Sequence, residues 1–436
     1  MKQAARALPF FLFAGVAVQA FGFYLFMILI PFVLYWRVPL SQTMKLLLRT
    51  LAVCLFLLWV IFPLGNFYNL WQGPHTHIPW DQLLKSHFSS SFAICALLLY
   101  IFTWKDKFQG VGVTPSSDSF VKEDGFVPFL QGFFIASILE TLWIMSQQKF
   151  GLDFSLHSYG EAKRMSTGLF RTPGFYSHPL TFAGVSLAYI GWLGSLILTG
   201  KTIVWNRSKL FLLILLHSYF AFASGGRFVT LIVLLGAPLF LLIYYYQARK
   251  SEAKPFAFSL FAVAACLTGF LLWQLGVGER FFSLVSGTHP EELDRLIFWR
   301  VHWQMFLDKP FFGQGFAQLN AFAREQYYNH LGYASLTNKY PAHNFILEVL
   351  SNVGLFGFSV ILGALTVGGR ALHKLCQLSE QETYFKTFLV ALGLNFINGL
   401  TQNVFFDASV MYIYHSLLFL MIWNAMGFHG RTRNAA

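Results

Sequence analysis

Charged residues are scarce in this chain. Of its 436 residues only 11% are Asp, Glu, Lys or Arg, whereas an average soluble domain carries about 25%. Hydrophobic residues make up 56% and occur in runs such as LFLLILLHSYFAFA and FVTLIVLLGAPLFLLIYYY. These runs approach the roughly 20 residues that a helix needs to cross a bilayer. The composition excludes a soluble globular protein and predicts an all-α polytopic membrane protein, with residues 1–436 forming a single membrane domain.

The chain also lacks the motifs of several other classes. It has four cysteines and no CxxC or His/Cys zinc spacing, so we expect no metal site. The net charge of +12 is not gathered in a basic module outside the apolar runs. Nucleic acid is therefore not an expected partner, whereas the lipids of the membrane are.

The charge pattern predicts about 12 transmembrane helices with both termini cytoplasmic. In this topology 19 of the 31 Lys and Arg residues fall in the seven cytoplasmic segments, as the positive-inside rule requires. The first two spans could instead form one tilted helix, but merging them would break this alternation. The predicted spans are at about residues 8–21, 22–36, 50–65, 87–104, 127–147, 177–199, 208–223, 227–247, 255–276, 342–368, 385–404 and 408–427.

One predicted outer loop, residues 277–341 between spans 9 and 10, is far longer than an ordinary connection. It contains FAQLNAFAREQYYNHLGY, from Phe316 to Tyr333, in which apolar residues recur at helical spacing. This pattern predicts a helix in the membrane interface with its apolar face down. Such a helix could cover a lipid-entry site, or it could be a packing helix with no further role.

Basic residues in the predicted outer segments have no topological role and are candidates for anion binding. Arg171, Arg295 and Arg300 lie in outer loops, and Arg227 stands at the start of a span after two glycines. An arginine near the bilayer centre costs about 2.5–3.5 kcal/mol. Arg227 therefore either snorkels to the interface or meets an anionic ligand. Arginine suits phosphate because its planar guanidinium makes paired hydrogen bonds and stays charged.

A proline turn places His343 and Asn344 at the start of the apolar span at 342–368, in YPAHNFILEVLSNVG. A neutral imidazole suits a general base near pH 7, but the helix N-terminus equally favours His343 as a donor to phosphate. Either residue could instead cap the helix, and Asn344 is interpreted as a cap or an orienting group. His178, which opens the span at 177–199, is either a second polar ligand or an interfacial histidine.

Three stretches on the predicted outer face together resemble the O-antigen ligase and polymerase superfamily. They are RTPGFYSHPLTFAG from Arg171, SGGRFVTLIV from Ser224, and RLIFWRVHWQMFLDKPFFGQGFAQL with YPAHNFILEVLSNVGLFGF from Arg295. Their order, spacing and shared outer face make the resemblance specific. The strongest match is carried by Arg295, Trp299, Pro310, Gly313, Gly315, His343, Asn344, Gly354 and Gly357.

This resemblance implies a GT-C-like fold and a metal-independent, inverting glycosyltransferase, with no cofactor, on the periplasmic face of the bacterial inner membrane. The implied donor is an O-antigen glycan on undecaprenyl diphosphate, and the implied acceptor is a hydroxyl of lipid A–core oligosaccharide. The chain also has no Asp-x-Asp motif, which metal-dependent glycosyltransferases often carry. We expect catalytic roles for His343, Arg227 and Arg295, and roles in binding the diphosphate or the acceptor for Arg171, Arg300, His178 and Asn344.

Two other functions stay open. Polymerases of the same superfamily often have two large outer loops with Arg-x10-Gly motifs. Here one loop is clearly longest, and the pairs Arg171/Gly184 and Arg300/Gly313 each enclose twelve residues, which favours a ligase. A flippase or other transporter of lipid-linked oligosaccharide would place charges near the bilayer midplane, commonly in repeated, broken helices. Because the outer charges cluster on one face and no repeat is visible, ligation is the preferred prediction.

Overall fold

The computed structural model describes nine segments of the chain: residues 42–72, 126–151, 170–176, 178–199, 207–247, 290–316, 318–336, 339–379 and 381–402, together with scattered positions from 405 to 422. This part of the chain is helical and contains no β-strand. Four predicted spans lie outside it, and the span at 408–427 is described only at scattered helical positions. The four spans outside are those at 8–21, 22–36, 87–104 and 255–276.

Seven of the predicted spans correspond to helices in the described part of the chain. They are α3 (Gln42–Gln72), α6 (Phe126–Phe150), α7 (Pro179–Thr199), α8 (Arg207–Ala223), α9 (Arg227–Gln247), α14 (Phe345–Leu378) and α15 (Glu382–Gly399).

Three of these helices are long and apolar enough to cross a membrane by length and composition, and α8 and α9 contain shorter apolar helices. The candidate spans are Lys45–Asn66 in α3, Pro179–Leu198 in α7 and Phe345–Leu378 in α14. This arrangement is consistent with a polytopic helical membrane protein. The total of twelve spans stays a prediction.

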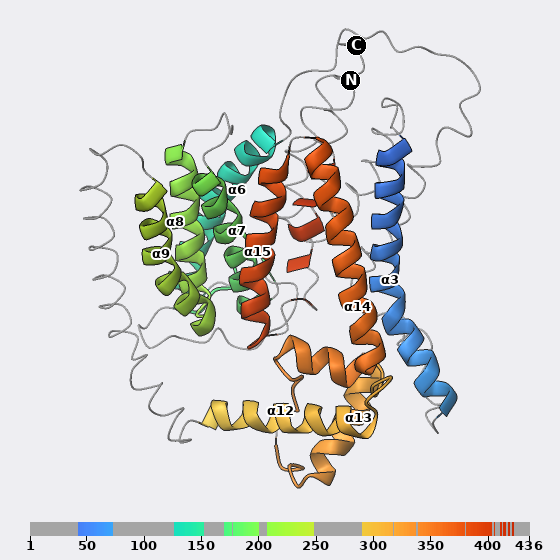
Figure 1. Cartoon of the computed structure of the whole chain (residues 1–436). Coiled ribbons are helices and arrows are strands. Elements are labelled where there is room, and N and C mark those ends of the chain that lie inside the picture. The colour runs from blue at the N-terminus through green and yellow to red at the C-terminus, as the bar shows by residue number, and fades with distance from the viewer. Residues whose placement is uncertain are drawn as a thin grey trace.

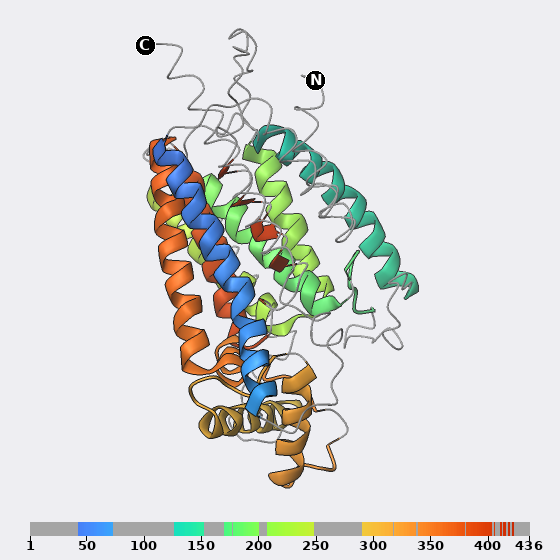
Figure 2. The same cartoon turned by 90° about the vertical axis from the view of Figure 1, so that its right-hand side faces the viewer.

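The helices form a bundle in which α3 packs along α14, and α7 packs against both α8 and α15 (Figures 1 and 2). Close approach of α7 and α15 depends on Gly191. A Cβ atom there would lie 2.7 Å from Leu394 Cδ1 and 3.2 Å from the Cα of Ala391. Large aromatic side chains of α7, among them Trp192 and Phe182, are buried, and Phe182 stacks on Phe220 of α8 with ring centroids 5.4 Å apart. A hydrogen bond from Asn395 Nδ2 of α15 to the Gly184 carbonyl of α7, at 3.0 Å, adds to this close packing.

One end of the bundle, which we call the loop end, gathers the segments that the sequence predicts on one outer face. The start of α14 contacts the end of α15, because Asn344 Nδ2 donates to the Leu400 carbonyl at 3.0 Å. The end of α6 contacts the turn before α7, because Gln147 Nε2 donates to the Gly174 carbonyl at 3.2 Å. Helix α12 (Pro290–Asp308) runs across this end (Figure 1). The predicted topology and its periplasmic orientation stay predictions.

The long loop contains two helices, α12 and α13 (Gln318–His330), of which the sequence predicted only α13. Their contact is a buried apolar cluster of Phe298, Val301 and Met305 from α12 with Tyr328 from α13. Part of the apolar face predicted to lie on the membrane packs against this cluster instead, through Ala323, Tyr327 and Leu331. In the described structure α13 is thus a helix packed on α12.

Helix α14 differs from the continuous helix predicted over 342–368. It begins at Phe345, and it is broken at Gly354, whose φ of 64° and ψ of −168° are not helical. The PFFGQG loop after α12 inserts into this break. It pairs the backbone groups that the break leaves without helical partners, as buried amides and carbonyls require. The four hydrogen bonds are Gln314 N to Ser351 O (2.8 Å), Gly315 N to Asn352 O (3.0 Å), Leu355 N to Pro310 O (2.8 Å) and Phe356 N to Phe311 O (3.0 Å).

Candidate functional site

His343 occupies a strained turn at the start of α14. Its φ of 49° makes it the one non-glycine residue with positive φ among the described residues. The left-handed conformation costs about 1–2 kcal/mol for a residue with a Cβ atom. The next residue, Asn344, caps α14, because its Oδ1 accepts the amide of Leu347 at 3.1 Å. The cap interpretation of Asn344 is confirmed, and the cap fixes the backbone on one side of His343.

The His343 ring lies beside two aromatic rings, those of Tyr340 and Phe298, and remains partly exposed. The ring centroids of Tyr340 and Phe298 are 5.8 Å and 6.2 Å from its own. No described residue makes a hydrogen bond to either ring nitrogen. Burial, helped by the positive charge of Arg295, lowers the pKa of His343 to about 4. The imidazole is therefore neutral near pH 7 and can accept a proton or a hydrogen bond.

Two other predicted site residues lie close enough to His343 to act on it electrostatically. Arg295 reaches it from α12, and His178 reaches it from the segment before α7, and both lower the pKa of His343. His178 Nδ1 also accepts the amide of Leu180 at 3.1 Å, so its ring caps α7. The structure thus places Arg295 and His178, from two other segments, within electrostatic range of His343.

Arg171 lies at the turn that leads into α9. Its Nε donates to the carbonyl of Ser224 at 2.5 Å, and a Cβ atom on Gly225 would lie 3.2 Å from that nitrogen. Gly225 has a φ of 64°, so the glycine allows both the turn and the close approach of the guanidinium. Arg227 is the first residue of α9, two positions further along. The two arginine positions therefore belong to one corner of the loop end.

Arg300 does not lie on the same side of α12 as Arg295. Five residues separate them, which is about 140° around a helix axis. The Arg300 side chain is exposed, and its Nη1 donates to the hydroxyl of Tyr333 at 3.1 Å. A ligand that meets both Arg295 and His343 would therefore not reach Arg300 along the same side of the helix.

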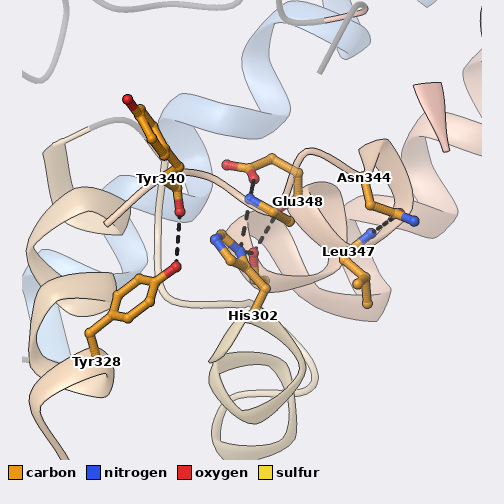
Figure 3. A network of polar contacts seen from close by, with 8 residues as sticks. His302, Tyr328, Tyr340, Asn344, Leu347 and Glu348 are labelled. Carbon is orange, nitrogen blue, oxygen red and sulfur yellow. Dashed lines mark hydrogen bonds and ion pairs between the residues drawn. The ribbon is translucent and has the colours of Figure 1, made fainter. Parts of the chain in front are cut away.

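Sequence reasoning missed a buried polar group five residues after His343, the side chain of Glu348 (Figure 3). Glu348, in the first turn of α14, is only 7% exposed, and its Oε2 accepts the amide of Ala342 at 2.8 Å. The same oxygen lies 3.9 Å from His302 Nδ1 of α12. The one signal in the sequence is an acidic residue in the first turn of an apolar helix, a position that the helix dipole favours.

Arg324 is a second charged residue near this group that sequence reasoning did not single out. It lies in α13 with a partly buried side chain, and burial lowers its pKa while the negative charge of Glu348 raises it. Its positive charge also acts on His302, whose pKa burial lowers to about 4. Arg324 is thus part of the charged surroundings of Glu348.

Within the described residues, no three His, Cys, Asp or Glu side chains gather where they could hold a metal ion. The charged groups near His343 are instead Arg295 and Glu348. This arrangement offers a guanidinium that can bind an anion next to a neutral imidazole that can take a proton.

Comparison with known proteins connects this site to a family. Residues 210–362 match the family model described as O-Antigen ligase. The resemblance to that superfamily is confirmed. The matched range contains five of the seven predicted site residues, and the other two, Arg171 and His178, precede it. It also contains Glu348 and both helices of the long loop, so the family match covers most of the site at the loop end.

The chain is also similar to a protein of Bacillus subtilis (strain 168), the teichuronic acid biosynthesis protein TuaE. The two are 26% identical over 180 residues, which cover 40% of this chain and 35% of TuaE. The match therefore spans about a third of the length of this relative. Its name concerns the biosynthesis of another glycan, which bears on the choice of acceptor below.

Proposed function

We propose that this protein is a membrane glycosyltransferase of the O-antigen ligase type. In the proposed reaction, an O-antigen glycan moves from undecaprenyl diphosphate to a hydroxyl of lipid A–core oligosaccharide on the periplasmic face of the bacterial inner membrane. The proposal is supported by a neutral, partly exposed His343 at the loop end, within electrostatic range of Arg295 and His178. Two of the three lie within the range that matches the O-antigen ligase family.

In this proposal His343 is the general base. The acceptor hydroxyl gives its proton to a ring nitrogen of His343 as its oxygen attacks the anomeric carbon of the donor sugar. The ring suits this role because it is neutral near pH 7 and partly exposed. A positioned base contributes about 10²–10⁴-fold to the rate. Because attack comes from the face opposite the leaving group, the sugar configuration inverts.

Arginines supply the charge that the leaving diphosphate needs. As the bond between the anomeric carbon and the diphosphate oxygen breaks, negative charge grows on the diphosphate. Arg295 is the proposed partner for this charge because, among the charged groups, it has the largest electrostatic effect on His343. Each charge-assisted hydrogen bond contributes about 1.5–3 kcal/mol. Arg171 and Arg227, which belong to one corner of the loop end, are proposed to bind the carrier or the acceptor.

The similarity to TuaE favours a second candidate function. Its name refers to teichuronic acid, and not to O-antigen or lipid A. The same chemistry, with the hydroxyl of another carrier-linked glycan as acceptor, would lengthen a glycan chain. Polymerisation is therefore the alternative, and it differs from ligation only in the acceptor.

The deciding experiment supplies both acceptors to the purified full-length protein in proteoliposomes. The donor is an undecaprenyl-diphosphate-linked O-antigen unit, and the acceptor is either lipid A–core or a second molecule of the donor. Products are separated on gels and weighed by mass spectrometry. Glycosylated lipid A–core supports ligation, whereas longer carrier-linked chains support polymerisation. If neither product forms and labelled donor only crosses the bilayer, the enzyme proposal is wrong and transport replaces it.

A further inference from the structure

Glu348 carries a carboxylate that the proposed reaction does not use directly. Glutamate is almost never fully buried unless it is paired, yet Glu348 is 7% exposed at the start of a long apolar helix. Figure 3 shows its carboxylate turned toward the imidazole of His302. The partners of the carboxylate indicate why it is there.

The first partner is the backbone immediately before His343. Glu348 Oε2 accepts the amide of Ala342 at 2.8 Å, so the carboxylate reaches back over the strained residue. On the far side of His343, the side chain of Asn344 accepts the amide of Leu347. The left-handed conformation of His343 is thus fixed by one side-chain acceptor on each side. Strained residues persist where the surroundings determine them in this way, and they are common at functional sites.

The second partner is a buried support from α12. His302 is fully buried, and its Nδ1 lies 2.7 Å from Ser351 Oγ and 3.9 Å from Glu348 Oε2. Ser351 Oγ donates its proton to the carbonyl of Glu348 at 3.1 Å. The serine oxygen also shares a hydrogen bond with His302 Nδ1, whose direction follows from the tautomer of the ring. The backbone and the side chain of Glu348 are both tied to this support.

The third observation is the sign of the charges around His343. Four groups act on its pKa: Arg295 and His302 from α12, His178 from the segment before α7, and Glu348 from α14. The first three lower the pKa of His343, and Glu348 raises it. Arg324 from α13 acts on Glu348 and His302. Among these groups Glu348 carries the negative charge, and its effect is opposite in sign to that of Arg295 and Arg324.

We propose that Glu348 is a positioning residue for His343, holding its turn through the Ala342 amide and supplying the negative charge that stabilises the imidazolium formed during transfer. This inference rests on the proposed function. In the step concerned, the acceptor O–H bond breaks and its proton passes to His343. The acceptor oxygen bonds to the anomeric carbon, and the electrons of the broken carbon–oxygen bond leave with the diphosphate. Glu348 itself gains no proton.

Two substitutions separate the two parts of this role. Glu348→Gln keeps an oxygen that can accept the Ala342 amide but removes the charge. Without that charge the pKa of His343 falls, so the acid limb of the pH–rate profile moves to lower pH by about one unit. The plateau rate also falls because the base is weaker. Glu348→Asp keeps the charge but is one methylene too short for the hydrogen bond, so its plateau rate falls while its acid limb stays near that of the wild type.

The matched control is Glu325→Gln. Glu325 is an exposed carboxylate of α13 that pairs with Lys339 at 3.4 Å, so removing its charge should leave both the acid limb and the plateau unchanged. All variants are assayed as full-length protein in proteoliposomes with the carrier-linked donor and lipid A–core. Thermal unfolding of each purified variant shows how much of any loss comes from the fold.

The outcomes separate this inference from the proposed function. If the wild type forms no product, the proposed function fails. If the wild type is active and Glu348→Gln keeps the wild-type pH profile, a role of Glu348 in the charge of the site is overturned. A loss of thermal stability with an unmoved acid limb overturns it equally, because a structural role alone would give that result. If Glu348→Gln is not recovered as folded protein, Glu348→Asp decides, and a wild-type plateau in that variant overturns the positioning role.

Discussion

Gly313 and Gly354 lie back to back where the loop after α12 enters the break in α14. A Cβ atom on Gly313 would lie 2.4 Å from the carbonyl carbon of Asn352, and one on Gly354 would lie 2.4 Å from that of Phe311. Their φ angles, 66° and 64°, both lie in the left-handed region. The two segments interlock at a point where only hydrogen atoms fit.

Replacing either glycine should therefore unfold the loop end. We expect Gly354→Ala and Gly313→Ala each to lower the free energy of unfolding by about 3 kcal/mol or more, because strain in the backbone and overpacking add together. Thermal unfolding of the detergent-purified protein measures this change. The control is Gly363→Ala in the same helix, where no atom lies within 4 Å of the new Cβ. The Gly363→Ala variant should be neutral or stabilised by up to about 1 kcal/mol. If Gly354→Ala unfolded at the same temperature as Gly363→Ala, the tight contact between the two segments would be contradicted.

His343→Asn should remove activity without removing the fold. Asparagine tolerates the left-handed region better than most residues, so the turn should survive. Transfer should fall by about 10²–10⁴-fold because the base is lost. Glycan transfer in proteoliposomes and thermal unfolding measure the two effects. His330→Asn, an exposed change in the last turn of α13, is the control that should alter neither. Wild-type transfer by His343→Asn would rule out the base role.

The acid limb of the pH–rate profile should depend on Arg295. Because the positive charge of Arg295 lowers the pKa of His343, which stands at about 4, removing this charge raises it. A base is active when neutral, so in Arg295→Ala the acid limb of kcat/KM should move to higher pH. Arg295→Lys keeps the charge and should keep the limb, and Arg300→Ala on the other side of α12 should keep it as well. A limb that stays in place in Arg295→Ala would contradict the electrostatic link.

Bound donor should raise the pKa of His343, as removing the charge of Arg295 does. A diphosphate next to Arg295 offsets its positive charge, and the pKa of His343 then rises. The profile of kcat reports the complex, whereas that of kcat/KM reports the free enzyme. We therefore expect the acid limb of kcat at higher pH than that of kcat/KM. Coincident limbs in the wild type would indicate that the diphosphate binds away from Arg295.

Asn344 should contribute to stability through two separate hydrogen bonds. Asn344→Ala loses the cap on Leu347 and the bond to the Leu400 carbonyl, and should lower the free energy of unfolding by about 1–2 kcal/mol. Asn344→Asp keeps the capping oxygen but loses the amide donor, so its loss should be smaller. Thermal unfolding ranks the three proteins. An Asp variant as unstable as the Ala variant would show that the link to α15 matters more than the cap.

Much of the fold could be read from the sequence because apolar runs are direct evidence of helices. The helices α3, α6, α7, α8, α9 and α15 begin and end within a few residues of their predicted spans, except that α3 is longer at both ends. The break at Gly354 could not be read, since a single glycine in an apolar run is compatible with a continuous helix. It depends on the loop at 310–315, forty residues earlier in the chain.

Some residues of the candidate site could likewise be predicted from the sequence, and others could not. Arg295 was predicted as a site residue because it is a basic residue in a predicted outer segment. His343 was predicted because it and Asn344 form a polar pair just before an apolar run. The supporting groups had no such signal. Glu348 and Ser351 read as part of an apolar helix, and His302 lies in α12, which was not predicted. Their role depends on contacts between α12 and α14 that no local pattern in the sequence reports.

The break in α14 has a mechanical consequence for an enzyme in a bilayer. Spanning helices tilt when the hydrocarbon thickness around them changes. In a continuous helix such tilting would swing its first turn, together with His343, away from Arg295. Here the section from Phe345 to Val353 is bonded to the loop after α12 and joined to the rest of α14 through Gly354. We therefore expect a change in lipid composition to alter the slope of the longer section of α14 while His343 keeps its place relative to Arg295.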